Sequence, residues 1–134
     1  MKIVVLKFGG TSVGTIEKIK KIAEIIKNFK KKKYKVIVVS SAMSGVTNDL
    51  VKKSKEISGT FSDAEYDTLV SSGEQVSCSL IAGRLLHIGI KSRSWLAWQI
   101  PIFTKGGHKN SRINFVNKNK IIKYLKLNFS FPGT

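Results

Sequence analysis

The chain has 134 residues, of which 42% are hydrophobic, so a single packed core is the natural expectation. Lys and Arg number 24 against 8 Asp and Glu, and the resulting net charge of +16 is typical of proteins that bind nucleic acids or acidic membranes. The single cysteine, Cys78, excludes an intrachain disulfide and a CxxC metal site, which predicts a reducing, cytoplasmic location.

The basic residues do not form a recognised nucleic-acid-binding pattern. There is no RNP, zinc-finger or helix-turn-helix signature, and most of the cations are lysines spread along the chain. The densest run, at residues 30–33, falls where a helix is expected to end, and the helix dipole favours cations there. All eight acidic residues lie between Glu17 and Glu74, and the origin of the acid-free basic half stays open. Nucleic-acid binding is therefore the less favoured interpretation.

The first forty residues predict a β-α-β unit. Residues 3–6 are an apolar, β-branched run that is too short for a signal peptide or a membrane span but typical of a strand buried on both faces. Isoleucines then recur at helical spacing from Ile16 to Ile26, and residues 36–39 form a second run of the buried-strand type. We therefore expect an α/β fold with a parallel sheet and flanking helices, in a soluble protein without membrane contact.

The later elements are shorter and less regular. Helical patterns begin again at Val46 and at Val76, and the second of these closes near Gly89. Two strands, one helix and the start of a third strand are predicted beyond it, at residues 94–97, 100–103, 121–125 and 128–131. Pro101 places the second of these strands at an edge or at a strand start. No linker or repeat divides the chain, so we expect one domain over residues 1–134.

The motif KFGGTS at residues 7–12 lies between the first strand and the first helix. Backbone N–H groups at a Gly-Gly turn that opens a helix can hold an anion, and the missing side chains let a phosphate approach. Lys7 adds positive charge at the carboxyl end of the strand, where open α/β sheets bind ligands. The motif is not a Walker A loop, because its lysine precedes the glycines. Taken alone, it fits equally well a turn that serves only strand–helix packing.

The motif SSAMSGVTN at residues 40–48 follows the second strand in the same way. Its hydroxyl groups and glycine offer several donors to an anionic ligand at the sheet edge where the first motif lies. The alternative is an ordinary helix cap, because Ser and Thr are favoured at that position.

These two motifs together resemble the signature pair of the aspartokinase family, with KFGGTSV at residues 7–13 and SAMSGVTN at residues 41–48. The segment SGEQVS at residues 72–77 resembles the family's Gly-Glu segment, and HKNSRI at residues 108–113 is an altered version of its His-Gly-Asn-Ala-Arg loop. The match spans almost the whole chain but only the amino-terminal part of a typical family member. The resemblance implies an amino acid kinase-like parallel-sheet fold that is incomplete at its carboxyl end.

The resemblance also implies a reaction, in which ATP with Mg²⁺ phosphorylates the side-chain carboxylate of L-aspartate on the pathway to lysine, threonine and methionine. The residues implied to bind ATP are Lys7, which is also the catalytic group, Phe8, Gly9, Gly10 and Ser41. Thr47 and Glu74 are implied to hold aspartate, and no residue is implied as a metal ligand. The alternative for Glu74 is an acid in the first turn of a helix, where the dipole favours it. A substrate carboxylate, with a pKa of about 3.9, needs no general base at neutral pH.

The sequence also departs from the family. The Gly-Phe-Gln-Gly turn of the family is replaced by FSFPGT at residues 129–134. The nucleotide-site half and the regulatory domains of the family have no counterpart in residues 1–134. Three hypotheses follow: an aspartokinase or its amino-terminal part, an inactive module that retains the phosphate loop, and a basic nucleic-acid-binding protein. The protein partners left open are a second copy of the chain and the carboxyl-terminal part of a kinase.

Overall fold

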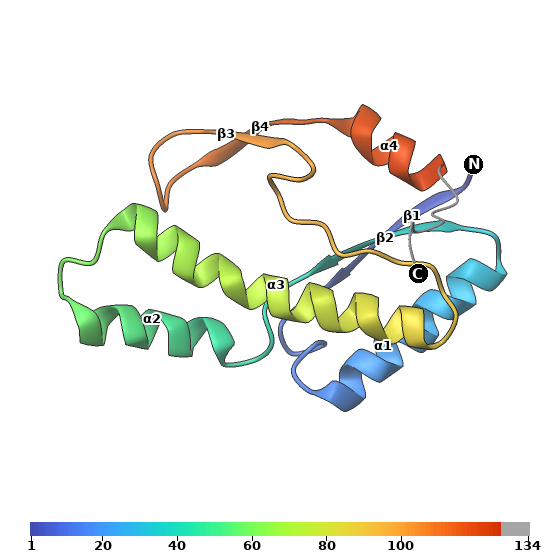
Figure 1. Cartoon of the computed structure of the whole chain (residues 1–134), viewed down its shortest axis with the longest axis horizontal. Coiled ribbons are helices and arrows are strands. Elements are labelled where there is room, and N and C mark those ends of the chain that lie inside the picture. Colours follow the sequence, from blue (N-terminus) through green and yellow to red (C-terminus); the bar gives the residue numbers. More distant parts are fainter. Residues whose placement is uncertain (127–134) are drawn as a thin grey trace, which may run out of the picture. The chain divides into compact units, whose positions relative to one another are not determined.

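The computed structural model describes residues 1–126, which divide between one unit of residues 1–94 and a second that begins at Trp95. The elements of the first unit are β1 (Ile3–Phe8), α1 (Ile16–Lys31), β2 (Lys35–Ser40), α2 (Val46–Ile57) and α3 (Asp63–His87) (Figure 1). Those of the second are β3 (Ile102–Lys105), β4 (Arg112–Val116) and α4 (Lys118–Lys126). That residues 1–134 all belong to one catalytic domain stays a prediction.

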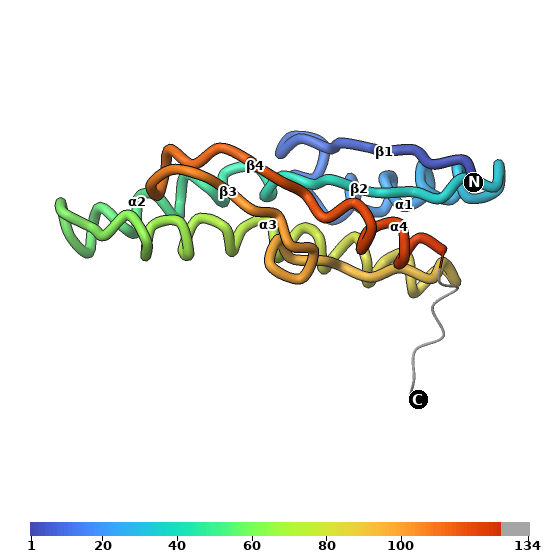
Figure 2. The backbone as a smooth tube through the Cα atoms, turned by 90° about the horizontal axis from the view of Figure 1, so that it is seen from above, coloured from blue at the N-terminus to red at the C-terminus, as the bar shows by residue number. Residues whose placement is uncertain are grey.

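The first two strands and the helix between them form the predicted β-α-β unit. Strands β1 and β2 pair in parallel with Phe8 opposite Ser40, and Figure 2 shows them running side by side. Helix α1 begins after Thr15, whose Oγ1 accepts the backbone N–H of Lys18 at 3.3 Å, a favourable helix cap. The lysine run at residues 30–33 lies at the end of α1, as predicted.

The core of the first unit lies between the sheet and the helices α1 and α3. The spacing of the isoleucines of α1 correctly predicts its buried face from Ile19 to Ile26, whereas Ile16, the first residue of the pattern, is 45% exposed. Alternate residues of the strands, including Leu6 and Val38, pack against this core. Its buried apolar members are Val13, Ile19, Ile22, Ala23, Ile26, Ile81 and Leu85.

The prediction that both strands are buried on both faces is wrong. Ile3 is 42% exposed, Val5 59% and Val39 48%, and we call these three residues the exposed sheet face. Within the first unit, the core that α1 and α3 form contacts the strands through Leu6 and its alternate neighbours. Successive side chains of a strand point to opposite faces, so the other set is left outside this core.

Helices α2 and α3 follow β2 as a pair that runs side by side in opposite directions (Figure 1). The third helix begins at Asp63, well before the predicted Val76, and it ends at His87. Gly89 has a φ of 78°, a left-handed conformation that glycine adopts at little cost, and the chain turns there as predicted.

The second unit contains an antiparallel hairpin and a helix. Strand β3 begins directly after Pro101, which confirms the prediction of a strand start, and its pairing with β4 is irregular between Phe103 and Thr104. The predicted helix near residues 121–125 is confirmed as α4. None of the helices in the part of the chain that the structure describes combines the length and the apolar composition that a bilayer crossing needs.

The strand predicted at residues 94–97 is wrong. The carbonyl of Leu96 accepts the N–H of Gln99 at 2.9 Å, and the Gln99 side chain in turn accepts the N–H of Leu96 at 3.0 Å. These local bonds hold the backbone in a turn, so this segment is not extended and does not pair as a β-strand. The strand predicted at residues 128–131 lies outside the described residues.

Candidate functional site

The loops that follow β1 and β2 lie against each other at the carboxyl end of the parallel sheet, as the sequence predicts. Ser41 donates its N–H to the carbonyl of Phe8 at 3.0 Å, which extends the pairing of the strands into the loops. A Cβ built on Gly10 would lie 3.1 Å from the carbonyl oxygen of Ala42. The first loop is therefore in backbone contact with the second.

The two glycines of the first loop serve different purposes. Gly10 makes room for the close approach to Ala42, which favours the packing interpretation of the Gly-Gly turn at this position. In residues 1–126, apart from the chain neighbours, no atom lies within 4 Å of a Cβ built on Gly9. The carbonyl of Gly9 accepts the N–H groups of Ser12 at 2.9 Å and Val13 at 3.2 Å. Val13 is fully buried and anchors this turn in the core. The space beside Gly9 is open to a ligand.

Two lysines flank the first loop. Lys7 is exposed and, because it alternates with Leu6 and Phe8, it lies on the face of β1 opposite the core. Lys18, in the first turns of α1, donates its Nζ to the carbonyl of Thr11 at 2.8 Å. The sequence does not single out Lys18, because one lysine in a lysine-rich helix carries no distinguishing signal.

The hydroxyl groups of the second loop do not cap α2, so the helix-cap alternative is wrong. The N-cap residue is Gly45, with a φ of 83° and no side-chain cap. The first turn is instead closed by backbone bonds, in which Val46 donates to Met43 at 3.1 Å and Asp49 donates to Gly45 at 3.0 Å. Thr47, a predicted aspartate-binding residue, lies half-buried in this first turn.

Glu74 lies in the middle of α3, which begins at Asp63, so the alternative of a first-turn acid stabilised by the helix dipole is wrong. Its Oε1 accepts the N–H of Ala42 at 3.3 Å, which places the half-buried carboxylate against the second loop. Burial, and to a smaller extent the negative charge of Glu74, raises the pKa of the Cys78 thiol on the next turn of α3. Thr47 and Glu74 thus both border the second loop, from different helices.

A third contact between α3 and the second loop comes from Ser77, which is fully buried. Its Oγ lies 2.7 Å from the carbonyl oxygen of Ser41 and 3.3 Å from the Oγ of Ser40. Ser77 is the last residue of the SGEQVS segment. From the sequence alone, helical spacing places it on the same side of the helix as the residues three and four positions before it, and shows nothing more. The sequence therefore identifies the segment but not this residue's role.

The altered fourth motif, residues 108–113, lies in the second unit, in the β3–β4 connection and the start of β4. Ser111 donates its Oγ to the carbonyl of Gly107 at 2.8 Å, and Lys109 has a φ of 62°. Residues 129–134 lie outside the described residues. Among residues 1–126, no three His, Cys, Asp or Glu side chains gather as metal ligands.

The chain is similar to known proteins over nearly its full length. The model of the amino acid kinase family matches residues 2–132. An aspartokinase of Rickettsia felis is 47% identical over 131 residues, 96% of this chain and 33% of that protein. An aspartate kinase of Stutzerimonas stutzeri is 40% identical over 126 residues, 94% of this chain and 31% of that protein. The chain therefore spans about a third of the length of the curated relatives it matches.

A solved structure agrees with the fold. The crystal structure of aspartate kinase from Synechocystis is 43% identical to this chain and has a TM-score of 0.63. The match covers 66% of this chain and 15% of that chain. The parallel sheet with flanking helices is therefore shared with a solved kinase, which confirms the expected fold class.

Proposed function

The chain belongs to the amino acid kinase family, and we propose that it is the amino-terminal part of an aspartokinase catalytic domain. Its reaction would transfer the terminal phosphoryl group of ATP to the side-chain carboxylate of L-aspartate. The observation that carries this proposal is the contact between the KFGGTS loop and the SSAMSG loop at the carboxyl end of the sheet. Open α/β sheets bind their ligands at this end of the strands.

The residues of the first loop fit a nucleotide polyphosphate. Among the described residues, nothing outside the immediate chain neighbours lies within 4 Å of a Cβ built on Gly9, so a phosphate group has room to approach the backbone there. Lys7 precedes this turn and Lys18 contacts its far side, so positive charge flanks the loop. We propose that Lys7 is the catalytic group and that Phe8, Gly9 and Gly10 line the phosphate site. Gly10 would act chiefly by bringing the loops together.

Ser41 would bind the same nucleotide from the second loop through its side chain, since its N–H is donated to the carbonyl of Phe8 and holds the residue beside the first loop. When bound with ATP, Mg²⁺ supplies charge neutralisation, and phosphate oxygens provide much of its preferred ligand set. The chain's own contribution is to bind and orient the phosphates through backbone donors and lysines.

For aspartate, we propose that Glu74 faces the substrate ammonium group and that the Thr47 hydroxyl binds a substrate carboxylate. The two residues border one loop from two helices, which suits a small ligand that carries both an ammonium group and carboxylates. The reacting carboxylate is already ionised at neutral pH, with a reference pKa of about 3.9. The protein therefore needs to position the acceptor and neutralise charge rather than remove a proton.

This reaction would begin the route from aspartate to lysine, threonine and methionine, and we infer a cytoplasmic setting in which ATP and aspartate are available. The lone thiol, Cys78, suits a reducing compartment.

Calorimetric titration of the chain tests the proposal. At two salt concentrations, we expect ATP with Mg²⁺ and aspartate to bind and duplex DNA to bind only weakly. DNA affinity with a steep salt dependence, in the absence of ATP binding, would favour the nucleic-acid hypothesis instead.

Turnover is tested separately, by trapping aspartyl phosphate with hydroxylamine. We expect the chain alone to be inactive and activity to emerge when a polypeptide carrying the rest of an aspartokinase is added, because incomplete positioning of the phosphoryl group costs orders of magnitude in rate. The matched control is the same mixture with the Lys7→Ala chain. Robust activity of the 134-residue chain by itself would contradict this expectation.

A further inference from the structure

We propose that Ser77 is a positioning residue, which holds the nucleotide-binding loop after β2 on helix α3 without touching either ligand. This inference rests on the proposed function, since it assigns a purpose to a residue behind the proposed ATP site. Ser77 is fully buried, so it acts on a ligand only through the groups it contacts.

The hydroxyl of Ser77 bridges the helix and the loop. Its Oγ donates to the carbonyl of Ser41 at 2.7 Å and lies 3.1 Å from the carbonyl of Glu74, in its own helix. It also accepts the hydroxyl of Ser40 at 3.3 Å. The last residue of β2 and the first residue of the loop are therefore both fastened to one side chain of α3.

Two neighbouring residues of α3 fasten the following part of the same loop. Glu74 accepts the N–H of Ala42 at 3.3 Å. Gly73 allows the closest approach, because a Cβ built on it would lie only 2.9 Å from the Cβ of Ala42. Gly73 and Ser77 are four residues apart and thus on one side of the helix. Successive residues of the loop are in this way set against one side of α3.

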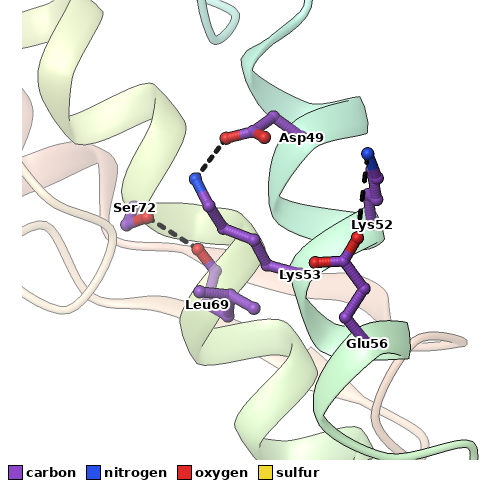
Figure 3. A network of polar contacts seen from close by, with 6 residues as sticks. All are labelled: Asp49, Lys52, Lys53, Glu56, Leu69 and Ser72. Atoms are coloured by element: carbon purple, nitrogen blue, oxygen red, sulfur yellow. Dashed lines mark hydrogen bonds and ion pairs between the residues drawn. The ribbon is translucent and has the colours of Figure 1, made fainter.

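The hydroxyl of Ser77 differs from that of an ordinary helical serine. Ser54 of α2 is also buried, but its Oγ donates within its own helix, to Val51 at 2.8 Å. Ser72 of α3 likewise donates to Leu69 at 2.7 Å, as Figure 3 shows. Either serine can lose its hydroxyl without releasing the loop, so both are matched controls for Ser77.

Removal of the Ser77 hydroxyl would break both bonds that join α3 to Ser40 and Ser41, and the Ser40 hydroxyl would keep only its local bond to the Ser41 carbonyl, at 3.0 Å. This part of the loop would then have no side-chain link to residue 77 and could shift on α3, because each lost buried hydrogen bond weakens its attachment. The shift would pass to the first loop, because the carbonyl of Ala42 lies against Gly10. Both loops of the proposed ATP site would then be displaced by a change at a residue that no ligand reaches.

The experiment compares Ser77→Ala with Ser54→Ala and Ser72→Ala in the 134-residue chain. Affinity for ATP with Mg²⁺ is measured by calorimetry, and the exchange rate of the Ala42 amide is measured by NMR. We expect Ser77→Ala to weaken ATP binding about tenfold and to speed Ala42 exchange by a similar factor, as the loss of one buried hydrogen bond implies. Each control should change ATP affinity by less than about twofold. Ser77→Cys, with its weaker donor, should fall between the unaltered chain and Ser77→Ala.

Unchanged ATP affinity and unchanged Ala42 exchange in folded Ser77→Ala would overturn the inference. If Ser77→Ala does not fold, Ser77→Cys decides on the same two measurements. Failure of both to fold while Ser54→Ala folds would mean that Ser77 is simply a core residue, and would also overturn it. If the unaltered chain does not bind ATP, the proposed function fails, and the Ala42 exchange rates still decide whether Ser77 holds the loop.

Discussion

The contact of Gly73 with the second loop makes the effect of a single methyl group predictable. A Cβ built on Gly73 would lie 2.9 Å from the Cβ of Ala42 and 3.2 Å from Cγ1 of Val46. Carbon atoms pack at about 3.5–4.0 Å, so Gly73→Ala would force the loop and α2 away from α3 by roughly 0.5 Å or more. Overpacking of this kind costs about 1–3 kcal/mol.

The same substitution has a favourable component, because alanine is better than glycine in a helix by about 0.8–1.0 kcal/mol. Gly83→Ala isolates this component, since Gly83 is in the same helix and is exposed, and since no described residue outside the local helix backbone comes within 4 Å of its built Cβ. We expect Gly83→Ala to stabilise the chain by about 1 kcal/mol. Gly73→Ala should be less stable than Gly83→Ala by the steric cost alone, about 1–3 kcal/mol.

Urea unfolding followed by circular dichroism measures both variants against the unaltered chain. With a slope of about 1–3 kcal/mol per molar urea, the two midpoints should differ by roughly 0.5–2 M, with Gly73→Ala the lower. Equal upward shifts of the two midpoints would refute the argument, because they would mean that Gly73 has no close neighbour in solution.

Three further predictions concern the site. Lys7→Ala should abolish measurable ATP binding in calorimetry but leave the urea midpoint unchanged, because the exposed side chain contributes charge and not core packing. An unaltered ATP affinity would refute the phosphate-loop assignment. Lys2→Ala is the control, at another exposed lysine near the amino terminus. Glu74→Gln should weaken aspartate binding far more than ATP binding, because it removes the charge but keeps an oxygen that can accept the Ala42 N–H; equal losses for the two ligands would indicate a structural role. The pKa of Cys78 is raised in the folded state by burial and by Glu74, so the folded state holds this proton more tightly than the unfolded chain. The associated stability is fully present below the unfolded thiol pKa, about 8.5, and is lost as the pH rises toward the folded pKa. When the pH is raised from neutral to above the folded pKa of the thiol, the free energy of unfolding should therefore fall less for Cys78→Ala than for the unaltered chain. Equal decreases would contradict the pKa shift.

The β-α-β unit could be predicted because its signals are local. The spacing of isoleucines in α1, the glycines after β1 and the second apolar run each specify one element, and a parallel pair joined by a helix is the arrangement that satisfies them. The meeting of the two loops then follows, since parallel strands in register end at the same edge. In the structure, Ser41 accordingly donates its N–H to the carbonyl of Phe8 at 3.0 Å.

The burial of the strands could not be predicted from the same residues. Val5 is as apolar as Leu6, yet Leu6 packs on the core and Val5 is 59% exposed. An apolar run shows that a strand forms, but whether its second face is covered depends on elements elsewhere in the protein. The start of α3 is hard to predict for a different reason. Its first turns, from Asp63, are polar and half-exposed, so they have little apolar periodicity to detect.

The motifs single out the residues of the candidate site, whose roles stay predictions, but they do not predict the contacts between those residues. The motif identifies Glu74, whereas its bond to Ala42 joins positions 32 residues apart, and the bond of Ser77 to Ser41 joins positions 36 residues apart. Contacts over such separations depend on the angle and depth at which α3 packs on the sheet. No local pattern encodes these quantities, and so Ser77 could be found only in the structure.

The exposed sheet face has a consequence for how the molecules behave toward one another in solution. Apolar surface is exposed at Ile3, Val5 and Val39, on a chain whose net charge is +16. Electrostatic repulsion between the molecules therefore opposes their association through this face. The range of that repulsion contracts from about 10 Å at 0.1 M ionic strength to about 3 Å at 1 M. Sulfate, which also strengthens apolar association, should therefore cause clustering at concentrations where the fold is intact. Light scattering during a salt titration would detect this association, and Val5→Thr should shift its onset to a higher salt concentration.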